Sequence, residues 1–208
     1  MAENRKRQGG RKKVDKRAKV REKLLSGFTL IEVLMTIVIL AILAAVAVPG
    51  FSVWLPNYRL KAAARDVVSN FQLAKMGAIK DNRVWAVVFD RGGTPGRYFI
   101  CSDPGANGNW EGAAGDDTVE KTIDLASYQS GVDYGHGIAT TNATEDGGPF
   151  PVDDISFIGN VATFSPKGTV NRVGYVYLSN RRGASCAVGA PSTAGVIVLK
   201  RWTGSEWE

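Results

Sequence analysis

Few residues in this sequence could do nucleophilic or acid–base chemistry. The 208 residues include one histidine, His136, and two cysteines, Cys101 and Cys186. A thiol needs an adjacent base to act as a nucleophile, but no cysteine or serine motif accompanies His136, which lies in the glycine-rich segment YGHGIA. A structural histidine is therefore favoured over a Cys186–His136 dyad. Two cysteines and one histidine are also too few for a zinc site. We expect no enzyme, no bound metal and no cofactor.

One acidic segment raises the question of calcium. The sequence DPGANGNWEGAAGDD carries four carboxylates, those of Asp103, Glu111, Asp116 and Asp117. Calcium binds carboxylate oxygens, but this segment lacks the alternating ligand spacing of a calcium loop. We predict a solvated surface loop and keep calcium as the weaker alternative. The segment RGGTPGRY lacks the spacing and the following helix of a dinucleotide site, so it is interpreted as a turn.

The positive charge of the chain is confined to its beginning. The formal net charge is +6, but residues 1–27 contain 11 Lys or Arg against 3 Asp or Glu, which is a net charge of +8. The remaining residues contain 15 Lys or Arg against 17 Asp or Glu, a net charge of −2. If the first segment is removed during maturation, little electrostatic support remains for general binding of nucleic acid.

Residues 28–48 form a run long enough to cross a membrane. The run FTLIEVLMTIVILAILAAVAV has 21 residues, and its polar members are Thr29, Glu32 and Thr36. A helix of this length spans about 30 Å, the thickness of a hydrocarbon core. The preceding basic residues predict a cytosolic N-terminus and an extracytoplasmic remainder. A cleaved secretory signal ending near AVAVPG is the alternative, but it leaves the acid at Glu32 unexplained.

The junction before this run carries a specific motif. The sequence LLSGFTLIEV resembles the class III signal of type IV pilins and type II secretion pseudopilins: a glycine, then Phe28, then an apolar helix with Glu32 four residues later. The resemblance implies that a prepilin peptidase cuts between Gly27 and Phe28 and methylates the new amino group of Phe28. The apolar helix is then retained.

The resemblance also gives roles to two residues of the helix. Cleavage leaves a positive amine on Phe28, which the Glu32 carboxylate of a neighbouring subunit can neutralise at low dielectric, and this pair would set the axial register of a filament. Glu32 snorkelling to the membrane interface is the alternative. Pro49 matches the family proline that closes the first apolar segment and lets the helix bend or melt. The 27-residue leader is long for this signal, and initiation at Val20 would shorten it to eight residues.

The rest of the sequence predicts an α+β fold. After Pro56 an apolar stripe recurs at helical spacing, so we expect an amphipathic helix over residues 49–80, interrupted at the prolines; the stripe comprises Leu60, Ala64, Val67, Phe71, Ala74 and Ala78. Residues 81–208 should form a β-rich globular domain with one antiparallel sheet. The expected strands cover residues 84–90, 98–102, 121–128, 155–158, 161–164, 174–179 and 195–202.

A second, narrower resemblance concerns the globular part. The helix from Asn57 and the segments TFSPKGTV, GYVYLSN and GVIVLKRWTGSEW look like the GspH/FimT group of minor pilins and pseudopilins. The resemblance implies a minor subunit that primes or caps a filament. It implies three partners besides the membrane: the prepilin peptidase, an inner-membrane assembly platform and other pilin-like subunits. The chain would be a single-pass inner-membrane protein that is later incorporated into a filament.

Two further properties of the globular part stay open. Some proteins of the FimT type bind DNA for uptake; here Arg181, Arg182 and Arg201 could contact phosphates and Trp202 could stack on a base. The net charge of −2 and the alternation of Lys200 and Arg201 along a strand argue against DNA. Cys101 and Cys186 would lie where disulfides persist, but a bridge requires Cα atoms within about 7 Å.

Overall fold

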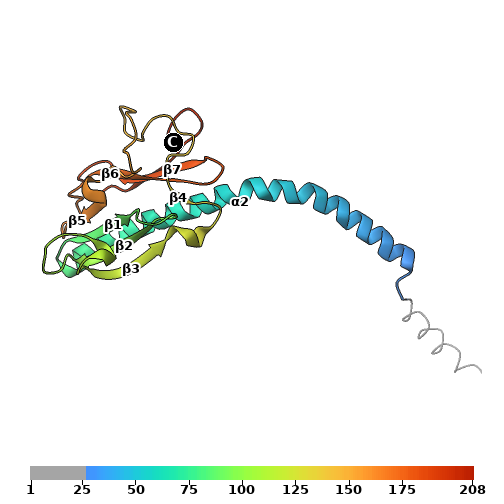
Figure 1. Cartoon of the computed structure of the whole chain (residues 1–208), viewed down its shortest axis with the longest axis horizontal. Helices are drawn as coiled ribbons and strands as arrows, with labels where there is room; N and C mark the ends of the chain where they lie inside the picture. The colour runs from blue at the N-terminus through green and yellow to red at the C-terminus, as the bar shows by residue number, and fades with distance from the viewer. Residues whose placement is uncertain (1–26) are drawn as a thin grey trace, which may run out of the picture. The chain divides into compact units, whose positions relative to one another are not determined.

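The computed structural model describes residues 27–208. The expected leader and the alternative start at Val20 lie outside the described residues, except for Gly27. The chain divides into two units, one ending at Pro49 and the other spanning Gly50–Glu208. Figure 1 shows the elements of both units, coloured along the chain.

One long helix, α2, covers Leu30–Asp81. It is 52 residues long and passes through Pro49 and Pro56 without a break, so the expected interruption at the prolines is wrong. Proline removes one N–H and crowds the preceding turn, but the hydrogen bonds on either side of each ring still hold the helix. The helix therefore continues into the globular unit as one element.

The C-terminal half of α2 buries the predicted stripe. All six stripe residues, from Leu60 to Ala78, are buried in the main hydrophobic cluster. One polar residue, Asn70, is buried on the same side and is 3% exposed. Its amide nitrogen donates to the Tyr98 hydroxyl at 2.8 Å, and its oxygen accepts from the Lys121 ammonium at 3.0 Å. Both ends of the amide are thus satisfied, as burial requires.

The first sheet has the order β3-β2-β1-β5 and is antiparallel throughout. The predicted hairpin around RGGTPG is confirmed as β1 (Trp85–Asp90) and β2 (Arg97–Asp103). Strand β5 (Val161–Phe164) is confirmed as well. Strand β3 (Thr118–Asp124) begins before the strand expected over residues 121–128 and ends earlier, because a 3₁₀ turn, η2 (Leu125–Tyr128), replaces the second half of the expected strand.

A second antiparallel sheet has the order β4-β6-β7-β8, so the globular unit contains two sheets where one was expected. Strand β6 (Gly174–Ser179) was predicted, and β8 (Val198–Arg201) is the shorter core of the strand expected over residues 195–202. Strands β4 (Asp133–Tyr134) and β7 (Ser185–Ala190) were not predicted. The strand expected over residues 155–158 is wrong: only a single bridge joins Ile155 to Val176.

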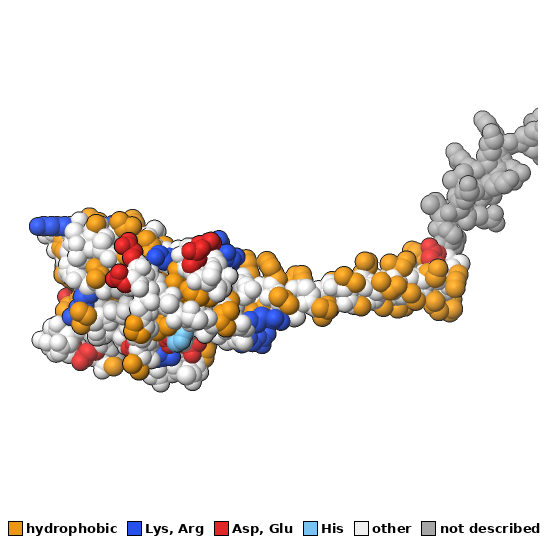
Figure 2. All heavy atoms as spheres, turned by 90° about the horizontal axis from the view of Figure 1, so that it is seen from above, with side chains coloured by type: hydrophobic (Ala, Val, Ile, Leu, Met, Phe, Trp, Pro, Cys, Tyr) orange, Lys and Arg blue, Asp and Glu red, His pale blue; other side chains and the backbone are white. Residues whose placement is uncertain are grey.

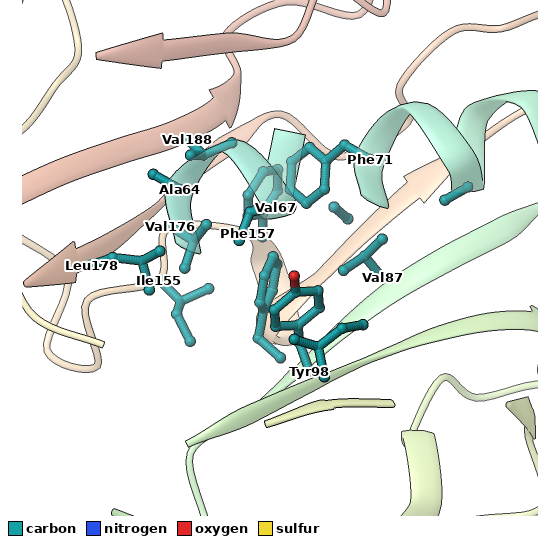
Figure 3. Packing of buried hydrophobic residues seen from close by; sticks show 14 of the residues in the cluster. Ala64, Val67, Phe71, Val87, Tyr98, Ile155, Phe157, Val176, Leu178 and Val188 are labelled. Atoms are coloured by element: carbon teal, nitrogen blue, oxygen red, sulfur yellow. The ribbon is translucent and has the colours of Figure 1, made fainter. Parts of the chain in front are cut away.

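The helix and the inner faces of both sheets share one core. Figure 3 shows Val67 and Phe71 of α2 among side chains from both sheets, such as Val87 and Val188. Phe71 packs edge-on against Phe157 and Phe164 at 5.9 and 5.6 Å. Because one helix face touches both sheets, α2 fixes the globular unit as a single body.

Loops cover the outer faces of the sheets. Trp110 packs on the first sheet in a cluster with Phe99 and Cys101. Phe150 and Trp207 pack on the second sheet in a cluster with Tyr175 and Tyr177. The central strands of both sheets are therefore covered on two sides, which explains why β2 and β7 are buried at nearly every position.

Candidate functional site

At the start of the described chain, a short segment without regular secondary structure leads directly into a helix. Residues 27–29 have no secondary structure, and α2 begins at Leu30. Thr29 caps the helix: its hydroxyl accepts from the Glu32 N–H at 3.3 Å, and its carbonyl accepts from the Val33 N–H at 3.2 Å. Threonine favours this position because its oxygen satisfies an orphan N–H of the first turn. The Gly27–Phe28 peptide bond thus lies in open backbone, two residues before the first helical residue.

Among the described residues 27–208, no contact requires a glycine at position 27. A Cβ added to Gly27 would meet no atom within 4 Å, and the residue does not need a left-handed backbone. The Phe28 side chain is 81% exposed. A requirement for glycine at this junction would therefore come from a processing enzyme rather than from the fold.

The Glu32 carboxylate has no partner among the described residues 27–208: no hydrogen bond or ion pair involves its oxygens. It lies three residues after the Thr29 cap, in the first turn of α2, where the helix dipole favours a negative charge. The dipole explains why a carboxylate is tolerated there, but it leaves the acceptor atoms free for a group outside the chain.

The first part of α2 is covered by nothing in the described chain. Every residue from Leu30 to Trp54 is exposed, and the helix contains a membrane-length window with a mean hydropathy of 2.8. Figure 2 shows this segment as a rod of hydrophobic side chains. Apolar surface of this extent calls for lipid or for other helices.

The two cysteines are free, so the disulfide considered from the sequence is not formed. Cys101 lies in β2 and belongs to the cluster outside the first sheet, whereas Cys186 lies in β7 and belongs to the main core. Burial, reinforced by the Asp117 and Glu120 carboxylates, raises the pKa of Cys101 to about 12. Burial raises the pKa of Cys186 to about 11 against the opposing charges of Arg201 and Lys61. Both thiols are therefore protonated and unreactive near neutral pH.

His136 is tied into a structural cluster. Its Nδ1 lies 2.5 Å from Asp154 Oδ1, and its ring stacks on Phe150 with centroids 4.0 Å apart. The other Asp154 oxygen accepts from the Arg91 guanidinium at 3.1 Å. This cluster joins the β1–β2 turn to the loop over the second sheet. The nearby Ser185 hydroxyl donates to the His136 backbone carbonyl at 2.5 Å, so it is bonded to the backbone of the histidine rather than to its ring.

The acidic segment folds on its own backbone. Asp103 accepts from the Gly105 N–H, Asp116 from the Ala106 N–H, and Asp117 from the Gly112 N–H at 2.7 Å. Within the part of the chain that the structure describes, no group of three or more acidic, histidine or cysteine residues could hold a metal ion. These carboxylates shape the loop that covers the first sheet.

The basic residues considered for DNA lie at one end of the second sheet. Arg181 and Arg182 form the β6–β7 turn, and Arg201 pairs with Cys186 just beyond it. The tryptophan that was expected to stack on a base and the lysine beside it are both engaged within the described chain. Trp202 is 7% exposed and packs on Trp207, and the Lys200 ammonium donates to the Ala143 carbonyl at 2.8 Å.

The comparisons with known proteins concern the N-terminal junction. Residues 26–48 match the family described as the prokaryotic N-terminal methylation motif. No curated protein and no solved structure matches the chain. The match supports a type IV pilin-like or pseudopilin subunit that is processed by prepilin peptidase, anchored in a membrane and assembled with other pilin subunits. Proteins of this type are structural subunits rather than enzymes.

Proposed function

We propose that the chain is a minor subunit of the GspH/FimT type that primes or caps a type IV pilus or a type II secretion pseudopilus. Residues 1–27 are the cleaved leader, residues 28–48 the membrane and filament-core helix, residues 49–80 its amphipathic continuation, and residues 81–208 the extracytoplasmic domain. The N-terminus faces the cytosol before extraction by an inner-membrane assembly platform. The strand segments quoted above support the family assignment.

The observation that carries this proposal is the arrangement at the start of α2. An open Gly27–Phe28 bond is followed by a capped helix whose Glu32 carboxylate has no partner among the described residues. Cleavage would place a methylated amine four residues from this acid. An amine and an unpartnered carboxylate at the exposed start of an apolar helix are suited to pairing between neighbouring subunits.

The experiment replaces Glu32 with Ala and follows two steps separately. Cleavage, read from the mass of the membrane-bound chain, should remain at the parent level because the peptidase acts at Gly27–Phe28. Incorporation, read from the amount of the chain in sheared filaments, should fall at least ~10-fold, since an unpaired buried charge costs several kcal/mol. Thr36→Ala, one turn further along α2, is the matched control.

Parent-level incorporation of Glu32→Ala would refute the charge pair, and loss of cleavage in this variant would place Glu32 in peptidase recognition instead. A subunit that appears along the whole filament in amounts similar to the main subunit would refute the minor role. Immunogold labelling of filaments distinguishes a tip position from a shaft position.

A further inference from the structure

Basic side chains gather at the end of the globular unit that follows the apolar segment in sequence. Five basic residues meet there, Arg59 and Lys61 from α2, Arg181 and Arg182 from the β6–β7 turn, and Arg201 from β8. We call this group the basic collar. Three aromatic residues of α2, Phe51, Trp54 and Tyr58, precede it, and we call them the aromatic belt.

Contacts within the globular unit hold the collar together. The Arg59 guanidinium donates to the Ser130 hydroxyl at 2.8 Å, and the Arg181 N–H donates to the Ser130 carbonyl at 3.2 Å. The Asn180 amide, next to Arg181, donates to the Asn57 side chain at 3.0 Å. The turn that carries two arginines is therefore fixed against the first turns of α2 in this unit.

Arg201 and Lys61 complete the same end. Arg201 stands opposite Cys186 in the β7–β8 register, two residues beyond the turn, and the charges of both Arg201 and Lys61 reach the Cys186 thiol. Figure 2 shows Lys and Arg side chains at the end of the globular unit where the helix enters it. Glu208, whose backbone pairs with that of Arg201, is the acid that this pairing brings beside the collar.

The collar cations are available for an external anion. Arg181, Arg182 and Arg201 are exposed, and within the described residues 27–208 no hydrogen bond or ion pair uses their guanidinium groups. Between Glu32 and Asp66 the sequence contains no acid at all. Positive charge is therefore concentrated at this end of the globular unit, with Glu208 beside Arg201 as an opposing acid, although the chain after Gly27 carries a net charge of −2.

The aromatic belt shows what kind of environment this end is built for. Trp54 stacks on Tyr58 at 4.9 Å and contacts Phe51 at 5.9 Å, yet the three side chains remain 54%, 53% and 62% exposed. Large amphipathic rings that stay exposed beside an apolar segment are typical of the membrane–water interface, where tryptophan and tyrosine lie at headgroup level.

The spacing along the sequence agrees with this environment. The uncharged stretch from Val33 to Tyr58 has 26 residues, which a helix extends over about 39 Å, close to the ~40 Å of a bilayer with its headgroups. The first charges beyond it are those of Arg59 and Lys61. Arginine stems lie along the interface while their heads reach phosphates.

We propose that the basic collar and the aromatic belt form a docking surface for the anionic phospholipid headgroups of the leaflet from which the globular unit emerges. The inference rests on the proposed membrane anchoring. Each basic residue near an anionic surface adds to the attraction, so five together make a strong preference for anionic over zwitterionic lipid. The contact would hold the globular unit against the membrane until the subunit is extracted.

The test uses the full chain in nanodiscs made from an equimolar mixture of phosphatidylglycerol and phosphatidylcholine. Native mass spectrometry counts the lipids of each class that stay bound when the disc is removed. Arg181→Gln/Arg182→Gln/Arg201→Gln should lower the preference for phosphatidylglycerol at least ~5-fold. The matched control, Lys80→Gln/Arg83→Gln/Lys167→Gln, removes the same charge elsewhere and should retain the parent preference, and all three proteins share the basic leader.

A conservative variant separates charge from folding. Arg181→Lys/Arg182→Lys/Arg201→Lys keeps the charge and should keep most of the preference for phosphatidylglycerol. If both collar variants lose this preference and both have an altered circular dichroism spectrum, the loss is an effect on folding and overturns the inference. An unchanged preference in the glutamine variant would also overturn it. A third result would overturn it too. In this result the chain, held in phosphatidylcholine discs, binds a short DNA duplex through the collar, and it shows no preference for phosphatidylglycerol.

The same experiment distinguishes the two proposals. A chain that does not insert into the nanodiscs, or that carbonate extracts from cell membranes, would refute the anchoring on which both rest. A chain that inserts normally but shows no collar-dependent lipid preference would refute only the lipid surface.

Discussion

At the residue scale, the glycines of α2 show how contacts decide the effect of a substitution. Gly77 faces Trp85, and an added Cβ would lie 2.7 Å from three atoms of the indole, which is closer than real contacts allow. Gly50 lies in the same helix, and an added Cβ there meets nothing within 4 Å. Helix propensity alone would favour alanine at both positions by about 1 kcal/mol.

We predict that Gly77→Ala lowers the free energy of unfolding by about 1–3 kcal/mol, because the indole is rigid and 9% exposed and must shift in a packed core. Gly50→Ala should leave it unchanged or raise it by up to about 1 kcal/mol. Chemical denaturation of both variants in detergent, followed by tryptophan fluorescence, measures the difference. Equal effects of the two substitutions would contradict the packing of Trp85 on α2.

The buried thiols predict a loss of stability at alkaline pH. An unfolded cysteine ionises near pH 8.5, whereas Cys186 and Cys101 keep their protons up to about pH 11 and 12 in the folded chain. The unfolded state therefore releases protons first, so the stabilisation is complete below about pH 8.5 and is lost as the pH rises toward the folded values. Between pH 8 and 10, Cys186→Ala should flatten the fall in unfolding free energy. An identical pH slope in the variant would contradict the burial of this thiol.

The sequence predicted the role of a residue only where its partners lie close to it along the chain. The Gly27, Phe28 and Glu32 motif is contiguous, so the sequence was enough to recognise it. Asp154 lies 18 residues from His136 and 63 residues from Arg91 along the chain, so the spacing of these residues did not predict their cluster. The sequence singled out Arg181, Arg182 and Arg201 as a basic group, but it gave no sign that Arg59 and Lys61 lie at the same end, because these two residues belong to a distant helix.

At the element scale, strands with β-branched and aromatic residues were predicted, and strands built of small residues were not. Strands β1 and β6 were predicted because their segments, VWAVVF and GYVYLS, are rich in β-branched and aromatic residues. β7 reads SCAVGA and contains one β-branched residue, so only its place between β6 and β8 identifies it as a strand. The second sheet could not be predicted for this reason.

The loop over the second sheet depends on the Asp154 cluster. Asp154 is 6% exposed and bonds to both His136 and Arg91. Asp154→Ala should lower the free energy of unfolding by about 2 kcal/mol and loosen residues 135–154, because it leaves two polar partners unsatisfied. Hydrogen exchange of this loop measures the effect, and Asp146→Ala, an exposed acid of the same loop, is the control. Parent-level protection in Asp154→Ala would show that aromatic packing alone holds the loop.

At the scale of the whole molecule, two features that no folded domain needs for itself define the chain. The apolar start of α2 is uncovered along its length, and the Glu32 carboxylate has no partner among residues 27–208. In the globular unit, by contrast, the central strands of both sheets are packed on both sides. The uncovered segment is therefore the part of the molecule that contacts other partners, first lipid and then neighbouring subunits.

Cleavage after Gly27 with retention of the apolar helix is what makes the chain a filament subunit. Intact mass and N-terminal sequencing of the protein from membranes, in cells with and without an active prepilin peptidase, test it most directly. We predict a mature chain that begins with methylated Phe28 and appears only when the peptidase is active. An uncut chain in both cells, or one that begins near Pro49, would refute processing at Gly27, because the apolar helix would then be a simple anchor or a discarded signal.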